Sequence, residues 1–184
     1  MKIISLTLSM FVCLTLLGQE KFKYDEKGLT PKYLVGEINE LNKNKIYEKS
    51  LNWVKETYKN PDKVIKTTIE NEKIRFQGVA MDYLCQSVLL STFCYNTTYT
   101  IELEFRDGKY KFTPTSISYR MPPSQYSSGG DVQVNIDNGE DFYKRNGKIK
   151  KQTKTMPESI EKLFNDLEKS LNNYINKDDS NEEW

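Results

Sequence analysis

A run of alternating apolar and polar residues in the middle of the chain restricts what this sequence can fold into. Its apolar members are Tyr99, Ile101, Leu103 and Phe105. After Asp107-Gly108 a second alternating run covers residues 110–119 and is interrupted at Pro114. Residues two apart point to the same face of a strand, and Asp-Gly is typical of the tight turns that need positive φ. The two runs therefore predict an antiparallel hairpin with one buried face.

Shorter alternating runs predict further strands before and after this hairpin. One lies at residues 32–38, a second at 65–69 and a third at 74–83. The alternation of the third changes phase at Gly78, which predicts a β-bulge at that residue. A weaker strand is predicted at residues 132–136, inside a stretch that is otherwise rich in turn residues.

Two segments have the period of amphipathic helices. Between residues 44 and 58 apolar side chains recur every three or four positions. Asn42 or Asn44 can cap the start of this helix, and Asn60-Pro61 ends it. Thr155-Met156-Pro157-Glu158 has the form of a capping box and opens a second helix. The order strand, helix, four strands, loop, helix predicts an α+β fold, an antiparallel sheet of about five strands with both helices on one face.

The first residues of the chain are typical of an export signal. Lys2 is followed by an apolar run over residues 3–17 and by Gly18, and this run is shorter than the about 20 residues of a membrane-spanning helix. An uncleaved anchor is the alternative, and Cys13 lacks the small preceding residue of a lipidation site. We expect export to the periplasm, the outer-membrane surface or the medium, with no transmembrane span after cleavage. The predicted parts are a signal peptide at 1–18, a flexible leader at 19–30, a single α+β domain at 31–175 and a disordered acidic tail at 176–184.

Charge and residue types exclude several classes of function. The chain has 27 basic and 26 acidic residues and no histidine. Cleavage after Gly18 removes only Lys2 from this balance, and a neutral protein exerts no long-range attraction on nucleic-acid phosphates or anionic lipids. The lack of histidine excludes Ser-His-Asp and Cys-His catalysis and removes the commonest zinc ligand. We therefore predict no nucleic-acid partner, no metal and no cofactor.

Cys85 and Cys94 enclose an unusually apolar segment. In an oxidising compartment they are a candidate disulfide, which would stabilise the fold by roughly 2–3 kcal/mol; two buried thiols are the alternative. The large apolar residues between them are Val88, Leu89, Leu90 and Phe93. We hypothesise that they form a contact loop for a partner protein or a lipid surface. The alternative is that the flanking strands run longer and bury these residues in the core.

Carboxylates are the remaining candidates for chemistry. Glu102 and Glu104 are two apart on one strand, so both point to the same face, and Asp107 follows in the turn. Such a pair performs acid–base work when one carboxyl is buried and its pKa is raised. The alternative is a solvated face balanced by nearby cations such as Arg75 and Arg106. We assign no catalytic residue.

Three parts of the chain together resemble a known family. They are the helix segment 46–54, the strand around Gly78, and the run 99–119 around Asp107-Gly108-Lys109-Tyr110. Over roughly residues 32–120 the chain resembles the bacterial domain-of-unknown-function family 4468, which is described as having a TATA-binding-protein-like fold. Its members are largely from Bacteroidetes and typically carry a signal peptide. The resemblance implies a curved sheet backed by helices and no particular activity.

These observations favour a non-enzymatic exported protein that binds an envelope protein, a peptide or a surface component. The predicted outer sheet face lacks the stacking aromatics and basic residues of nucleic-acid readers, so the fold name is not taken as a function. One alternative is a small-molecule or lipid binder that uses a cleft between sheet and helices. Another is an unrecognised hydrolase that uses carboxylates.

Overall fold

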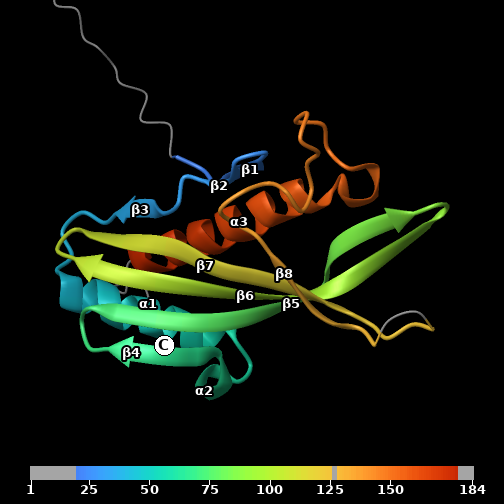
Figure 1. Cartoon of the computed structure of the whole chain (residues 1–184). Coiled ribbons are helices and arrows are strands. Elements are labelled where there is room, and N and C mark those ends of the chain that lie inside the picture. Colours follow the sequence, from blue (N-terminus) through green and yellow to red (C-terminus); the bar gives the residue numbers. More distant parts are fainter. Residues whose placement is uncertain (1–19, 126–127, 178–184) are drawn as a thin grey trace, which may run out of the picture.

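The computed structural model describes residues 20–125 and 128–177 (Figure 1). The predicted signal peptide and residues 178–184 of the predicted tail lie outside the described residues. In chain order the elements are β1 (Lys23–Asp25), β2 (Gly28–Thr30), β3 (Leu34–Glu37), α1 (Lys43–Thr57), α2 (Pro61–Val64), β4 (Ile65–Ile69), β5 (Lys73–Val88), β6 (Ser91–Arg106), β7 (Lys109–Met121), β8 (Gly130–Val134), the 3-10 turn η1 (Lys151–Thr153) and α3 (Met156–Asn176).

The main sheet has six antiparallel strands in the order β3-β7-β6-β5-β4, with β8 also paired to β7. β3 pairs with the first part of β7, over 109–112, and β8 pairs with its last part, over 117–121. β6 and β7 form the predicted hairpin, in which Arg106 pairs with Lys109 and Gly108 has a φ of 73°. The prediction of an α+β fold with an antiparallel sheet and helices on one face is confirmed.

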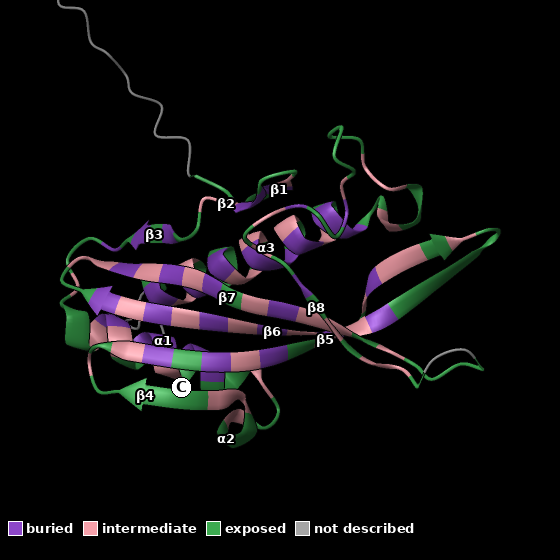
Figure 2. Cartoon of the chain, viewed as in Figure 1, coloured by how far each residue is buried: buried purple, intermediate pink, exposed green. Residues whose placement is uncertain are grey.

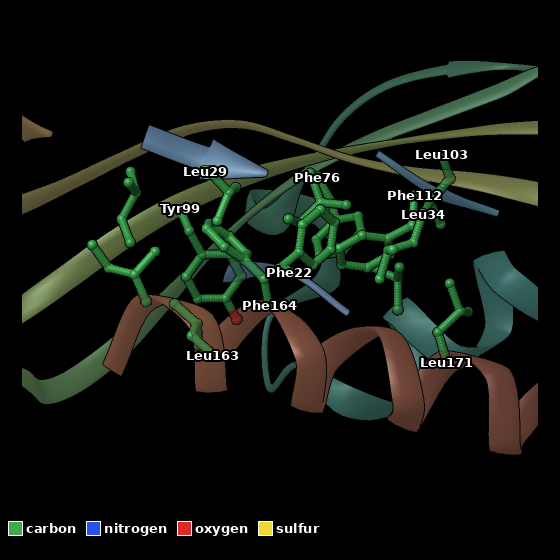
Figure 3. Close-up of a cluster of buried hydrophobic side chains, with 14 of the residues drawn as sticks. Phe22, Leu29, Leu34, Phe76, Tyr99, Leu103, Phe112, Leu163, Phe164 and Leu171 are labelled. Carbon is green, nitrogen blue, oxygen red and sulfur yellow. The ribbon is translucent and has the colours of Figure 1, made fainter. Parts of the chain in front are cut away.

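Aromatic side chains fill the space between the sheet and the helices (Figure 3). Phe76 from β5, Phe112 from β7 and Phe164 from α3 are fully buried. The Phe22 ring lies between two of them, with its centroid 6.1 Å from those of Phe112 and Phe164. Figure 2 shows the matching alternation of buried residues along β5, β6 and β7. Each such side chain stabilises the fold by about 1.5–3 kcal/mol relative to an exposed one.

The prediction of a flexible leader at 19–30 is wrong for the part that the structure describes. β1 and β2 pair as a small hairpin, and both Phe22 and Tyr24 are buried in the core. The Phe22 N–H donates to Asn165 Oδ1 at 2.9 Å, and the Tyr24 N–H donates to Glu161 Oε1 at 2.8 Å. Both acceptors lie on α3, so this segment belongs to the domain. The pattern was hidden because it is short: Phe22 and Tyr24, on either side of Lys23, are the two aromatic residues of a segment that is otherwise mostly charged.

The two long helices begin in different ways. Asn42, one of the two predicted caps of α1, accepts a hydrogen bond at Oδ1 from the Lys45 N–H at 3.0 Å. The capping box predicted for α3 does not form. Thr155 has helical backbone angles, φ −89° and ψ −15°, whereas a side-chain cap needs an extended backbone. Its Oγ1 instead donates to the carbonyl of Cys85 at 3.2 Å.

The bulge predicted at Gly78 is also wrong. Gly78 pairs with Tyr99 in regular register, and the register shift lies further along β5, between Ala80 and Leu84. Gly78 occupies the inner face, where a Cβ would lie 2.4 Å from Cζ of the Tyr99 ring. A glycine stands at this inner position because the ring of the paired residue, Tyr99, fills the space that an apolar side chain would occupy.

Gly78→Ala is expected to lower the free energy of unfolding by about 1–3 kcal/mol, the usual cost of overpacking. The Tyr99 ring has little freedom to move, because its hydroxyl is hydrogen-bonded to that of Tyr58 at 2.9 Å. Urea unfolding followed by circular dichroism measures the change. Gln77→Ala, on the outer face of the same strand, is the control and should stay within about 0.5 kcal/mol of wild type. A Gly78→Ala variant as stable as wild type would contradict this packing.

Candidate functional site

The outer part of β5 and β6 leaves the sheet as a two-stranded extension, residues 84–95, which we call the arm (Figure 1). At its root, residues 81–83 of β5 oppose the single residue Asn96 of β6. Asp82 has a φ of 47°, and its N–H donates to Asn96 Oδ1 at 3.0 Å. An irregularity of this kind bends and twists a hairpin, and the arm accordingly diverges from the sheet.

A disulfide clamps the arm near its root. Five residue pairs, from Leu84–Tyr95 to Val88–Ser91, form its ladder. Cys85 and Cys94 are directly opposite each other, with Cα atoms 4.0 Å apart, and their side chains are joined. Of the two alternatives for these cysteines, the structure has the bridged one. Since a lone two-stranded hairpin is marginally stable in water, this bond keeps the arm formed beyond the sheet.

The root of the arm is fixed to the body of the domain. Leu84 is fully buried, and the Tyr95 ring packs on that of Tyr119 of β7 with centroids 5.3 Å apart. β5 is held as well: the Thr155 Oγ1 donates a hydrogen bond to the carbonyl of Cys85, and η1 lies beside this strand. The arm is therefore a defined projection of the domain.

The tip of the arm exposes two leucines completely. Leu89 and Leu90 form the two-residue turn and are 99% and 105% exposed. The end of the arm is coloured as exposed in Figure 2. Leu89 has a φ of 54°, a left-handed conformation that disfavours residues with a Cβ and is normally taken by glycine. Neither turn chemistry nor burial explains leucine at these positions. The exposed apolar side chains of these two leucines are therefore the candidate contact with a binding partner.

The structure differs from the core alternative considered for Val88, Leu89, Leu90 and Phe93. The strands do run longer than the sequence predicted, but the apolar residues do not enter the core. Phe93 is 52% exposed, and Val88 is half-buried. The four residues therefore lie on a protruding hairpin, and their role in contacting a partner stays a prediction.

The arm is also free of charge. Residues 83–101, from the root through the tip and back into β6, contain no Asp, Glu, Lys, Arg or His, in a chain that is 29% charged. Exposed strands normally carry charged side chains, which hinder unwanted pairing and aggregation. An uncharged stretch of this length is the signal in the sequence by which the arm could have been identified as an interaction surface.

A surface groove of about 740 Å³ lies at the root of the arm. Phe93 and Tyr95 line one side, and Met121 and Pro122 from the end of β7 line the other. Asp82 and Arg120 add charged groups at its margin. The groove continues the apolar surface of the arm toward the sheet.

The candidate carboxylates form an ion-paired surface. Glu102 accepts hydrogen bonds from Lys73 at 2.9 Å and from Nε of Arg75 at 3.0 Å. Burial alone would raise the pKa of Glu102, but these two cations outweigh it and hold the pKa below its ordinary value. Glu104 pairs with Lys111 at 2.6 Å. Acid catalysis needs the opposite shift, so the geometry matches the balanced face considered from the sequence.

The exposed Asp107 has a local structural role. It lies in the turn between β6 and β7, and its Oδ1 accepts a hydrogen bond from the Lys43 N–H, at the start of α1, at 2.9 Å. This contact ties the hairpin turn to the first turn of the helix. Asp107 is thus separate from the Glu102 ion pairs.

The buried carboxylate of the domain is Glu168 on α3, which sequence analysis did not single out. It is 4% exposed, and its Oε1 accepts a hydrogen bond from the Tyr110 hydroxyl at 2.8 Å. Burial raises the pKa of Glu168, against the opposing effect of the tyrosine. Burial also raises the pKa of Tyr110, and the Glu168 charge adds to that shift. The pair links β7 to α3 inside the core, where solvent has no access.

The predicted cleft between sheet and helices is occupied by the protein itself. The aromatic rings described above meet in the middle of this layer (Figure 3). Within residues 20–125 and 128–177, no helix is both long and apolar enough to cross a bilayer. In the same ranges no three His, Cys, Asp or Glu side chains are placed to hold a metal ion.

Comparisons with known proteins found two similar solved structures. One similar solved structure is the crystal structure of a DUF4468 family protein from Bacteroides ovatus, 13% identical, with a TM-score of 0.60 over 80% of this chain and 86% of that one. Another is that of a TBP-like protein from Parabacteroides distasonis, 16% identical, with a TM-score of 0.49 over 77% of this chain and 91% of that one. No curated protein matches the sequence.

The family comparison confirms the resemblance read from the residues. The matched segment begins in front of β3 and ends at the last residues of β7, so it includes α1, the arm and most of the sheet. The similarity of fold to the solved DUF4468 protein covers 80% of this chain. Residues 33–120 of this chain match the DUF4468 family, a domain of unknown function with a TBP-like fold.

Proposed function

We propose that this chain is an exported, non-catalytic binding protein of the bacterial envelope, and that it contacts its partner through the tip of the arm. The pattern of Lys2 and the apolar residues 3–17 supports export. The bridged cysteines fit an oxidising compartment, because cytosolic thiols are kept reduced. The related structures come from Bacteroides and Parabacteroides species.

The observation that carries the proposal is the full exposure of Leu89 and Leu90 on a disulfide-clamped projection. Covering two leucine side chains contributes about 1.5–3 kcal/mol each. A soluble domain gains nothing from presenting them to water, whereas a binding partner would remove both from it. Charge is absent from the whole arm, so the contact made there is apolar.

Leu89→Ser/Leu90→Ser is expected to release the protein from its partner without changing its stability. Native cells are fractionated, and the share of the protein that sediments with the envelope is compared between variants. Wild type should be retained, and the double variant should move to the soluble fraction. Thermal unfolding of the purified variants should coincide, since both leucines are outside the core.

Val79→Ser/Met81→Ser is the matched control. It also removes two exposed apolar side chains, which lie on the outer face of β5 before the arm. Its retention should equal that of wild type. Retention of the Leu89→Ser/Leu90→Ser variant at the wild-type level would overturn the proposed function.

A further inference from the structure

A strongly basic segment, residues 144–154, precedes α3, and its last residues lie beside the root of the arm. It contains Lys144, Arg145, Lys148, Lys150, Lys151 and Lys154 and no acidic residue. All of these except the half-buried Lys150 are exposed. The five exposed cations make no salt bridge with any residue in the described parts of the chain. The balanced charge of the whole chain therefore conceals an excess of positive charge along this segment, although Glu26 and Glu140 line the same surface hollow as Lys144 and Arg145.

The basic segment has a defined shape. Just before it, Phe142 is buried with its ring centroid 5.3 Å from that of Tyr24. The Lys144 N–H donates to the Lys148 carbonyl at 2.9 Å, which closes a turn, and the Lys150 N–H donates to the Phe142 carbonyl at 2.7 Å. The Lys150 ammonium group is also held, by the carbonyls of Glu140 and Asp141. The exposed cations are thus presented by a folded turn anchored in the core.

The arm projects from the side of the molecule at which α3 begins (Figure 1). η1, over 151–153, is part of the segment and lies beside β5. The next contact along the chain, from Thr155 Oγ1 to the Cys85 carbonyl, joins this region to the disulfide-clamped root. An uncharged projection with an apolar tip is therefore joined at its root to the end of a basic segment.

From this juxtaposition we propose that the arm and the basic segment together bind the surface of a bilayer that contains anionic lipid. The two leucines enter the acyl boundary, and the lysine and arginine side chains lie at the headgroup phosphates. The inference rests on the proposed function and names its partner. Apolar insertion combined with basic residues is the general mode of binding for peripheral membrane proteins.

The shape of the tip favours lipid over a protein as the occupant. A stable protein interface covers about 800 Å² on each partner and relies on shape complementarity. A narrow turn with two leucines offers little area of that kind. A bilayer accepts any apolar projection, and cations act on its surface within a Debye length of about 8 Å. Within this distance the local cations act on the bilayer surface, so the neutral overall charge of the chain does not prevent binding.

Sedimentation with lipid vesicles tests the inference on the mature, oxidised protein. One set contains phosphatidylcholine alone, and the other contains phosphatidylcholine mixed with phosphatidylglycerol. Binding should be stronger to the mixed vesicles and should fall as salt is added. Lys144→Gln/Arg145→Gln/Lys148→Gln should weaken binding to the mixed vesicles on the order of 100-fold, because each cation contributes roughly a factor of five. Lys55→Gln/Lys59→Gln/Lys63→Gln, which removes three exposed lysines elsewhere, should bind as wild type does.

The outcomes separate this inference from the proposed function. Equal binding to both vesicle types, or no effect of the Lys144/Arg145/Lys148 variant, would overturn the role of anionic lipid. Absence of vesicle binding together with tip-dependent retention in the envelope would mean that the partner is a protein: the lipid inference would then fail and the proposed function would stand. The salt dependence of the wild-type protein gives an answer even if a triple variant folds poorly.

Discussion

Phe22→Ala is expected to lower the free energy of unfolding by about 3–5 kcal/mol, the usual cost of removing a buried phenyl group. Phe22 is 1% exposed and lies between Phe112 and Phe164. Its backbone is also fixed at both ends, because Asn165 accepts from its N–H and donates to its carbonyl at 3.0 Å. Urea unfolding of the mature protein should show a lower midpoint with an unchanged slope.

Lys23→Ala provides the control for this substitution. Lys23 is the next residue in β1, and its side chain is exposed, so its removal should change stability by no more than about 0.5 kcal/mol. The sequence pattern favoured a flexible leader here, and a flexible leader would make both substitutions silent. A silent Phe22→Ala variant would therefore restore that interpretation.

Glu168→Ala is expected to lower the free energy of unfolding by about 2–4 kcal/mol. The substitution leaves a cavity between α3 and β7. It also leaves the buried Tyr110 hydroxyl without its acceptor, and this loss costs roughly 1–3 kcal/mol by itself. Glu168→Gln keeps an acceptor oxygen of the same size and should restore most of the loss at low pH. Thermal or urea unfolding of the two variants measures both effects. An alanine variant as stable as the glutamine variant would contradict the role of the hydrogen bond.

The same pair predicts a pH dependence with a definite sign. Burial raises the pKa of Glu168 above its ordinary value of 4.5, so the folded state binds this proton more tightly than the unfolded state. The contribution is complete below pH 4.5 and is lost as the pH rises through the folded-state pKa. Glu168→Gln has no such proton to lose, so its stability relative to wild type should increase from acidic to neutral pH. If the difference in stability between the variant and wild type did not change with pH, the pKa of Glu168 would be the same in the folded and unfolded states.

Local signals gave the architecture of the sheet. The alternation at 99–119 and the Asp107-Gly108 turn located β6 and β7 because a half-buried strand repeats every two residues. The helices followed from their apolar stripes. The bulge predicted at Gly78 was wrong. A glycine is needed there because the Tyr99 ring, which lies on another strand, occupies the space that a side chain would fill. Thr155 failed as a cap for a similar reason, since its acceptor is the distant Cys85.

The candidate site was harder to derive from the sequence. The cysteine spacing pointed to the arm, and the apolar residues between the cysteines pointed to its tip. Their exposure depends on where the strands leave the sheet, which the irregularity at 81–83 decides. The overall charge balance does not reveal the basic segment, because the total hides how the charges are distributed along the chain. Its place beside the arm depends on Thr155 and η1, which no local pattern reveals.

The way β3 and β8 share β7 has a consequence for behaviour at high concentration. They cover residues 109–112 and 117–121 of the same strand, so only a short interval of its backbone lies between them. That interval includes Pro114, which has no N–H to donate. An incoming strand from another molecule therefore finds no continuous template along β7. This edge of the sheet is thereby poorly suited to growth into fibrils.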